Sequence, residues 1–341
     1  MYDARFGITR KWDIPLLDGY DSTFVKNVAR NPGSNNFWGI INPGLLQQLR
    51  AEKFDAVLVY RWSLWSHLRV LGGFGKKLAL FFRGDSVLKS TQSGWQRHLQ
   101  QLLLRWVYRN VDKAFYVGAM NMEYFLHAGL RQDQLVYAPH AVDNSRFMER
   151  ETEYEAVATA ERKRLLIPGD AVVFLYAGKF YDLKNLSLLL QAFRKLKQAH
   201  YRLVLYGNGT EAANLQAIAA GDHRIIFEPF KNQSEMPWVY RVGDVFVLPS
   251  KSETWGLGVN EAMACKRAAI VSNRCGCVTE LIKEGTTGFS FVSDDEIGLV
   301  AAMQQFNSRE VAHDLGNAAF AHIQMFSLER VAEVIEETMG V

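Results

Sequence analysis

The chain has 341 residues, of which 48% are hydrophobic and 22% are charged. This length suits two domains, and the proportions are typical of globular proteins, so they exclude a disordered or fibrous chain. Residues 1–146 contain 19 Lys and Arg against 11 Asp and Glu, a net +8, whereas residues 147–341 contain 20 against 25, a net −5. The basic first half suggests an anionic partner, for which nucleic acid and an anionic membrane surface are both candidates. The alternative is scattered lysines and arginines that only keep the protein in solution.

The start of the chain and its cysteines indicate in which cellular compartment the protein works. No run approaches 18 apolar residues, and no apolar stretch of a secretory signal follows the first five residues. Cys265, Cys275 and Cys277 form neither a disulfide framework nor a pair of C-x-x-C zinc motifs. We therefore expect reduced thiols in a cytoplasmic protein.

The first half contains short apolar segments and one long helix. After an irregular start at residues 1–45, the predicted strands are 54–60, 78–82, 113–117 and 134–137. A helix is predicted over residues 95–107, with Arg97, Arg105 and Arg109 around an apolar face. That face contains Leu99, Leu102, Leu103, Trp106 and Val107. It packs either on the sheet of its own domain or against a membrane surface.

The second half alternates strands and helices. The predicted strands are 171–177, 202–206, 224–227, 244–248, 268–272 and 288–292, and the helices between them include 184–199 and 257–265. Near-continuous apolar strands separated by helices indicate a parallel sheet covered on both faces. The sequence thus predicts an α/β protein of two Rossmann-like domains, 1–146 and 147–326, facing across a ligand cleft. A last helix, 327–341, is expected to pack back toward the first domain.

The most informative motif is SETWGLGVNE at residues 252–261. It joins a predicted strand to a predicted helix, and three backbone N–H groups would lie at the helix start: those of Gly256, Leu257 and Gly258. Unpaired donors and the helix dipole favour a phosphate there. Glu253 and Glu261 flank this start and can accept hydrogen bonds from ligand hydroxyls. The alternative is a helix cap and a surface carboxylate.

A second motif follows the first strand of the back domain. Gly178–Asn185 reads GKFYDLKN, and it places Lys179 and Lys184 near the carboxyl end of that strand. Two cations at this end can neutralise a diphosphate. Two solvated loop lysines are the alternative.

Together these segments resemble the retaining family 4 glycosyltransferases of the GT-B fold, the glycosyl transferases of group 1. The donor-site block of that family is matched by SETWGLGVNEAMACKRAAIVSNRCGCVTELIKEGTTGFSF, which starts at Ser252. Further matches are G-K-x4-K at 178–184, YGNG at 206–209, GDVFVLPS at 243–250 and PHAVDNSRF at 139–147. The resemblance covers the back domain fully and the front domain from about residue 54.

The resemblance implies a role for each matching residue. Lys179 and Lys184 would stabilise the diphosphate leaving group, and Glu253 would contact hydroxyls of the transferred sugar, which makes these three the predicted catalytic residues. Glu261 would hold the ribose, and Phe230 would lie near the nucleobase. The predicted donor-binding residues are Gly207, Phe230, Gly256, Leu257, Gly258 and Glu261. The family needs no bound metal, so we expect no metal site and no cofactor beyond the nucleotide diphosphate sugar itself.

The resemblance also suggests where the acceptor binds. Arg83 and Asp85 follow the strand 78–82 and are candidates for the acceptor side of the cleft, with a structural Arg–Asp pair as the alternative. The acceptor would be a saccharide or a lipid-linked saccharide. The protein would work in the cytoplasm or peripherally at the inner membrane face.

The sequence departs from the family pattern at three places. ACKRA at 264–268 replaces A-C-G-x-P, so Lys266 would be strained where a left-handed Gly is usual. Lys179 replaces an Arg, which keeps the charge but not the bidentate fork. No strand, Gly-rich loop and helix open the chain, so we expect the first domain to lack a unit of at least ~30 residues and its sheet to start at 54–60.

Two other functions stay open. The chain could be a catalytically inactive, truncated homologue that acts as a binding or assembly partner. Gly207–Ala212, GNGTEA, also fits the G-x-G-x-x-A fingerprint of an NAD-dependent oxidoreductase, although the motif falls in a middle strand–helix unit. No nucleic-acid-binding module is recognised, so we expect no nucleic acid among the partners.

Overall fold

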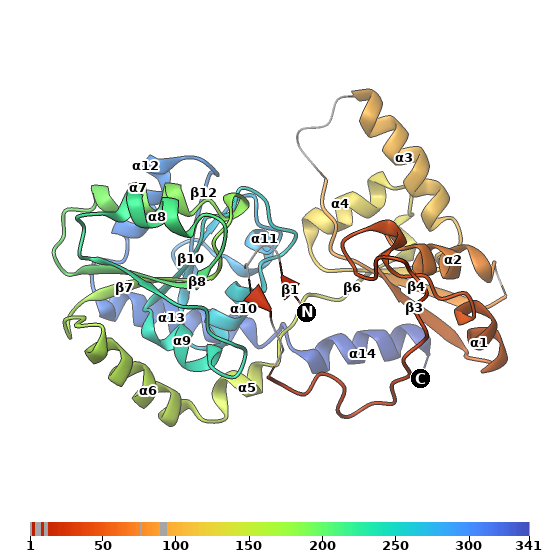
Figure 1. The fold of residues 1–341 in the computed structure, drawn as a ribbon, viewed down its shortest axis with the longest axis horizontal. Coiled ribbons are helices and arrows are strands. Elements are labelled where there is room, and N and C mark those ends of the chain that lie inside the picture. The colour runs from red at the N-terminus through yellow and green to blue at the C-terminus, as the bar shows by residue number, and fades with distance from the viewer. Residues whose placement is uncertain (1, 4–7, 10–12, 76, 89–93, 341) are drawn as a thin grey trace. The chain divides into compact units, whose positions relative to one another are not determined.

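The computed structural model describes residues 2–3, 8–9, 13–75, 77–88 and 94–340 and divides the chain into two compact units (Figure 1). The C-terminal unit consists of residues 1–16 and 140–330, and the N-terminal unit consists of residues 17–139 and 331–341. The boundary lies between Pro139 and His140, whereas the sequence placed it after residue 146.

The N-terminal unit is built on a four-stranded parallel sheet with the order β3-β4-β5-β6. Its strands are β3 (Ala56–Tyr60), β4 (Ala79–Arg83), β5 (Lys113–Tyr116) and β6 (Leu135–Tyr137). Its helices are α1 (Leu45–Ala51), α2 (Trp65–Gly73), α3 (Gly94–Tyr108) and α4 (Ala119–His127), with short 3-10 turns at Phe37–Gly39 and Gln132–Gln134. The sheet starts at β3, close to the predicted 54–60, and among the described residues no strand pairs with the outer side of β3.

Buried aromatic rings hold this unit together. Phe82 of β4 packs edge-on against Tyr108 of α3 and Phe125 of α4, with ring centroids 4.9 and 5.9 Å away. A second apolar cluster joins Phe81 of the same strand to Val334 of α14 (Leu328–Met339). Both clusters follow from strand alternation, because neighbouring residues of β4 project to opposite faces of the sheet.

The C-terminal unit contains a six-stranded parallel sheet with the order β12-β11-β10-β7-β8-β9. The strands are β7 (Val172–Lys179), β8 (Tyr201–Asn208), β9 (Ile225–Glu228), β10 (Val245–Leu248), β11 (Ala268–Ser272) and β12 (Gly288–Phe291). The chain winds outward from β7 through β9 and then returns to β10 beside β7. A parallel sheet with this reversal binds ligands at the carboxyl ends of the two strands that flank it.

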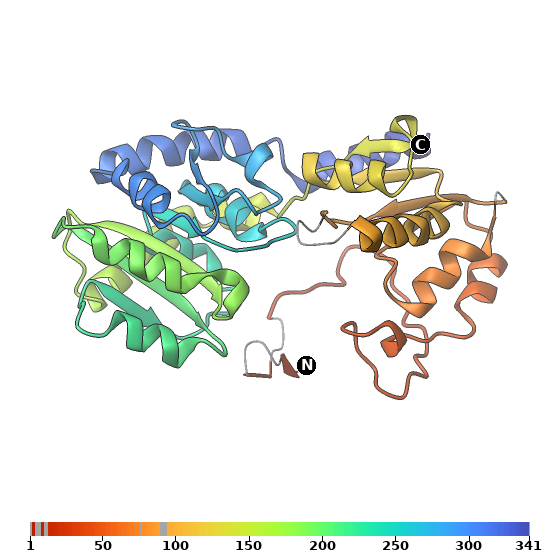
Figure 2. The same cartoon turned by 90° about the horizontal axis from the view of Figure 1, so that it is seen from above.

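Helices cover both faces of the six-stranded sheet (Figures 1 and 2). On one face lie α7 (Leu186–Lys195), α8 (Ala212–Ala219) and α12 (Glu296–Gln304). The other face carries α6 (Glu151–Arg164), α9 (Met236–Val242), α10 (Leu257–Ala264) and α13 (Arg309–Ile323). Two short helices, α5 (Asn144–Met148) and α11 (Val278–Leu281), and a two-residue strand pair, β1 (Tyr2–Asp3) with β2 (Ile8–Thr9), complete the unit. Because both faces are covered, the central strands are almost entirely apolar, as the sequence indicated.

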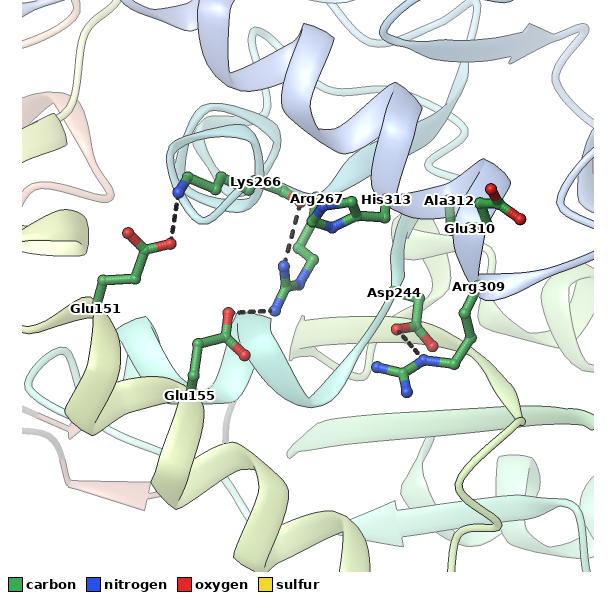
Figure 3. Close-up of a pocket in the computed structure, with 9 residues that line it drawn as sticks. All are labelled: Glu151, Glu155, Asp244, Lys266, Arg267, Arg309, Glu310, Ala312 and His313. Carbon is green, nitrogen blue, oxygen red and sulfur yellow. Dashed lines mark hydrogen bonds and ion pairs between the residues drawn. The ribbon is translucent and has the colours of Figure 1, made fainter.

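Ion pairs rather than apolar contacts hold α6 in place. Only Ala158 of this helix is buried, and Figure 3 shows Glu151 and Glu155 of α6 paired with Lys266 and Arg267. Arg162 Nη1 lies 3.0 Å from Asp244 Oδ1, and Glu155 Oε1 lies 2.8 Å from Arg267 Nη2. Glu155 also lies 3.3 Å from Nε of the fully buried Arg241. These pairs are partly shielded from water, so they are stronger than exposed surface pairs.

The predicted strain at Lys266 is present. Lys266 has φ +59, in the left-handed region that Gly occupies in the family pattern. Its ammonium group lies 2.6 Å from Glu151 Oε1 of α6 and 5.5 Å from the Phe320 ring centroid of α13. Its carbonyl oxygen lies only 2.3 Å from where a Cβ on Gly316 would stand, so α13 packs directly on this turn. Lys266 thus has a strained backbone, and its side chain connects α6 with α13.

We expect Lys266→Ala to lower the free energy of unfolding by about 1 kcal/mol, because Ala keeps the strain and loses the ion pair and the ring contact. Lys266→Gly loses the same contacts but relieves the strain, so it should be about 1 kcal/mol more stable than Lys266→Ala. Denaturant unfolding measures this order. At Gln191, an exposed position inside α7, the matched Ala and Gly variants should rank the other way. If the Ala variant were more stable than the Gly variant at both positions, the left-handed geometry of Lys266 would be contradicted.

Candidate functional site

A groove lies where the sheet order reverses, at the carboxyl ends of β7 and β10 in the C-terminal unit. Its first part has a volume of about 310 Å³ and its second about 180 Å³. The two parts share Ala177, Gly178 and Gly258, so they form one continuous depression, which we call the switch-point groove. Together they reach the size range of small-molecule binding sites.

Most of the predicted site residues line this groove. The first part is lined by Lys179, Lys184, Glu253, Gly256, Leu257 and Gly258. The second part is lined by Phe230, Gly258 and Glu261. Residues up to 82 positions apart in the chain thus meet at one edge of one sheet. The order of the strands brings them together, since the carboxyl ends of parallel strands lie at the same edge.

Glycines permit close packing in and beside the groove. A Cβ on Gly256, whose φ is +110, would lie 2.6 Å from Leu248 Cδ2. A Cβ on Gly207 would lie 1.9 Å from the carbonyl oxygen of Gly178. Gly207 itself does not line the groove, whereas its neighbours Tyr206 and Gly178 do. The predicted donor contact of Gly207 remains a prediction.

Helix α10 begins at the groove. Gly256 precedes its first residue, Leu257, and the Val259 N–H donates to the Gly256 carbonyl at 2.9 Å. Within the part of the chain that the structure describes, the N–H groups of Leu257 and Gly258 have no hydrogen-bond acceptor. Two free donors and the positive end of the helix dipole make this point favourable for an anion.

A lysine and a carboxylate face each other in the first part of the groove. Lys184 Nζ contacts Glu253 Oε2, and the two side chains are 15% and 22% exposed. Lys184 does not open α7 as the sequence suggested. It ends a 3-10 turn (Asp182–Lys184), and Asn185 at φ +54 then turns the chain into the helix. This left-handed residue points Lys184 at the groove rather than along the helix.

The loop of Glu253 is fixed through its backbone. The Glu253 N–H donates to Arg274 O at 3.1 Å, and the Glu253 carbonyl accepts from the Gly276 N–H at 3.0 Å. A Cβ on Gly276 would lie 1.9 Å from Thr254 O, so only Gly permits this approach. Lys179 is held in a similar way, because its carbonyl accepts from Tyr176 Oη at 2.9 Å. The charged groups therefore stand on rigid segments.

Glu261 lies in the second part of the groove beside a tyrosine. Tyr240 Oη donates to Glu261 Oε2 at 2.6 Å. Burial raises the pKa of the Glu261 carboxyl, and the Tyr240 hydrogen bond and the charge of Arg146 oppose that rise. Sequence reasoning missed Tyr240, because a tyrosine in a helix that otherwise packs in the core carries no motif. No other signal in the sequence marks Tyr240 as a site residue.

Arg83 and Asp85 belong to the N-terminal unit. Arg83 is 6% exposed, and its guanidinium donates to the carbonyls of Ala138 and Pro139, both at 2.9 Å. Burial lowers the pKa of Arg83, and the charge of Asp85 partly offsets this effect. The guanidinium thus ties the end of β4 to the chain that leaves β6. A contact of either residue with an acceptor remains a prediction.

A metal site would need several ligating side chains close together. No group of three or more His, Cys, Asp or Glu side chains among them is arranged to hold a metal ion. The three cysteines are buried in the C-terminal unit, and burial raises the pKa of both Cys265 and Cys275 to about 12. Such thiols are poor nucleophiles at neutral pH.

Part of the chain is similar to a known protein family. Residues 157–322 match the model of the glycosyl transferases group 1 family. The D-inositol 3-phosphate glycosyltransferase of Acidothermus cellulolyticus is 26% identical over 221 residues, which is 61% of this chain and 48% of that protein. The lipopolysaccharide 1,2-N-acetylglucosaminetransferase of Salmonella typhimurium is 28% identical over 52% of this chain and 50% of its own length. The chain thus spans about half the length of these curated relatives.

Solved structures share the fold. HepE of Anabaena in complex with UDP superposes with a TM-score of 0.71 at 17% identity, covering 87% of this chain and 82% of that one. A glycosyltransferase from Rickettsia africae gives a TM-score of 0.69 at 17% identity, covering 91% and 83%. These likenesses and the two parallel α/β sheets agree with the GT-B fold predicted from the sequence. They give no support to the oxidoreductase reading of Gly207–Ala212. Residues 157–322 thus match the group 1 glycosyl transferases, and the chain has the GT-B fold of two Rossmann-like units.

Proposed function

We propose that the protein is a retaining glycosyltransferase that moves a sugar from a nucleotide diphosphate sugar to a hydroxyl acceptor. One observation carries this proposal: two lysines, a helix N-terminus and two carboxylates line one groove at the switch point. Cations and free N–H donors suit a diphosphate, and carboxylates suit the hydroxyls of a sugar and a ribose. A nucleotide diphosphate sugar contains all of these groups in sequence.

Each groove residue takes a role in this proposal. Lys179, Lys184 and the α10 N-terminus would bind the diphosphate and stabilise the negative charge that grows on it as the glycosidic bond breaks. Glu253 would accept hydrogen bonds from the transferred sugar, after its contact with Lys184 is exchanged for contacts with the donor. The acceptor hydroxyl would attack from the face that the diphosphate leaves, which retains the configuration. These lysines and the helix dipole would take the electrostatic part that a metal plays in other transferases, so we propose a metal-independent reaction.

The second part of the groove would hold the nucleoside. Glu261 would accept hydrogen bonds from the ribose, and Phe230 would lie against the base. The acceptor would be a saccharide or lipid-linked saccharide, with Arg83 and Asp85 on its side. We propose that the protein works in the cytoplasm, with a peripheral contact at the inner membrane face. Thermal shift with UDP, GDP and their sugars would identify the donor class, because a bound ligand raises stability.

We expect Lys184→Ala and Glu253→Ala each to lower kcat/KM for transfer roughly 100-fold or more, because both remove charge that acts on the reacting groups. Radiolabelled transfer and donor hydrolysis measure this loss, and circular dichroism checks the fold. Lys195→Ala on α7 and Glu310→Ala on α13 are matched controls outside the groove and should keep near-normal turnover. Normal turnover in either groove variant would refute the assignment. UDP binding without turnover of any donor by the unmodified chain would instead favour the inactive homologue.

We expect Glu261→Gln to stabilise the protein at neutral pH and to weaken nucleotide binding. Since burial raises the pKa of this carboxyl above its ordinary value, its charged form costs stability at any pH above that raised pKa. The gain in unfolding temperature, about 2–4 °C per kcal/mol, should therefore be present at pH 7 and vanish on acidification below the ordinary glutamate pKa. UDP affinity should fall roughly tenfold, since the amide replaces one of the two acceptor oxygens with a donor.

The control for this variant is Glu310→Gln, which neutralises an exposed carboxylate on α13 and should change neither property. Scanning calorimetry and titration calorimetry with UDP give the two readouts. Unchanged UDP affinity in Glu261→Gln would remove Glu261 from the donor site, whatever its effect on stability.

A further inference from the structure

Helix α3 carries two apolar faces, of which only one is covered. Leu104, Val107 and Tyr108 are buried and pack into the core of the N-terminal unit. Five other apolar side chains of the same helix are exposed: Trp95 at 66%, Leu99 at 56%, Leu102 at 48%, Leu103 at 47% and Trp106 at 48%. The sequence grouped Val107 with these residues on one face, but the structure separates it from them.

The exposed residues form one continuous stripe. At about 100° per residue, Trp95, Leu99, Leu102, Leu103 and Trp106 project within an arc of about 100°. The buried Leu104 and Tyr108 lie on the far side of the helix. Figure 1 shows that one end of α3 projects away from the β3–β6 sheet. An apolar patch of this size on a surface normally has a partner.

Cations border this stripe, and a tryptophan lies at each of its ends. His98, Arg105 and Arg109 project along one edge, and Arg109 stacks on Trp106 with its guanidinium carbon 5.0 Å from the ring centroid. The sixteen residues from Trp95 to Asn110 contain no Asp or Glu. Tryptophans at both ends of an apolar stripe, with arginines beside it, are typical of helices that lie in the headgroup region of a bilayer.

We propose that α3 docks the protein on an anionic lipid surface, with the stripe from Trp95 to Trp106 inserted among the acyl chains and Arg105 and Arg109 on the headgroups. Charge complementarity favours lipid over a second copy of the chain. A dimer through this face would bring two rows of cations together with no carboxylate on α3 to neutralise them. Among the described residues no helix is long and apolar enough to cross a membrane.

This docking deepens the membrane contact in the proposed function, because a lipid surface would deliver a lipid-linked acceptor to the N-terminal unit. The vesicle experiment contains no donor, so its result does not depend on the donor chemistry. Conversely, UDP binding to the switch-point groove is measured without lipid. Failure of one proposal therefore leaves the other standing.

The full-length protein is mixed with vesicles of phosphatidylcholine, or of phosphatidylcholine with an equal part of phosphatidylglycerol, and bound protein is measured by co-sedimentation. We expect binding to the anionic vesicles that weakens as salt rises. Leu99→Gln with Leu102→Gln should lower the partition coefficient roughly tenfold or more, because two apolar side chains no longer insert. Arg105→Gln with Arg109→Gln should lower it by a similar factor on anionic vesicles only.

Matched controls use exposed residues of the same type on the C-terminal unit. Leu166→Gln with Ile297→Gln removes two apolar side chains that are 86% and 77% exposed, and Lys163→Gln with Lys197→Gln removes two exposed charges. Both controls should bind vesicles like the unmodified protein. Gln has nearly the helix propensity of Leu and Arg, so circular dichroism of the α3 variants should show an unchanged fold.

Three results would overturn the proposal. The first is no binding of the unmodified protein to anionic vesicles. The second is binding that the α3 variants and the controls weaken equally. The third is a dimer in light scattering that Leu99→Gln with Leu102→Gln dissociates while vesicle binding is unchanged, which would assign the stripe to a second copy of the chain.

Discussion

The candidate site depends on a close approach of backbone to backbone at the carboxyl edge of the six-stranded sheet. β7 and β8 pair along their whole length to Lys179 and Asn208, and at this end Gly207 lies directly against the Gly178 carbonyl. Gly256 likewise fits against Leu248 where β10 gives way to α10. A Cβ at either position would clash with these atoms, so the strands and the start of α10 could not approach as closely as they do. Glycine at these positions permits the approach that shapes this edge of the sheet.

Charge is arranged differently in the site and around it. In the groove, Lys184 and Glu253 neutralise each other, so neither of these two partly desolvated charges stands alone. Around α6 the ion pairs are structural, and they replace the apolar face that this helix lacks. Lys266 belongs to this second group: its departure from the family pattern is compensated by Glu151 and Phe320 rather than by any role in the groove.

The sequence predicted the C-terminal sheet well, since strands buried on both faces are apolar throughout and separated by helices with clear periodicity. It also predicted the groove residues that lie in motifs, such as Lys179, Glu253 and Glu261. It could not predict Tyr240, which contacts Glu261 across 21 positions, because nothing in the local pattern links them. The sequence also could not predict the buried contacts of Arg83 with two carbonyls. An arginine at the end of a strand has the same sequence context whether its side chain faces a ligand or the interior.

Helix α3 shows the same division between local pattern and packing. Its sequence determined that it is a helix, that it is basic, and that it has more apolar residues than one core face needs. Only the tertiary structure decided which of them are covered: Val107 packs inside, while Trp106 beside it stays exposed. In general, the sequence by itself determined the secondary structure, the charge pattern and the residue types of the site, because these depend on neighbours in the chain. The order of the strands, the burial of Glu261 and Arg83, and the uncovered stripe depend on segments far apart in the sequence, so only the folded chain could decide them.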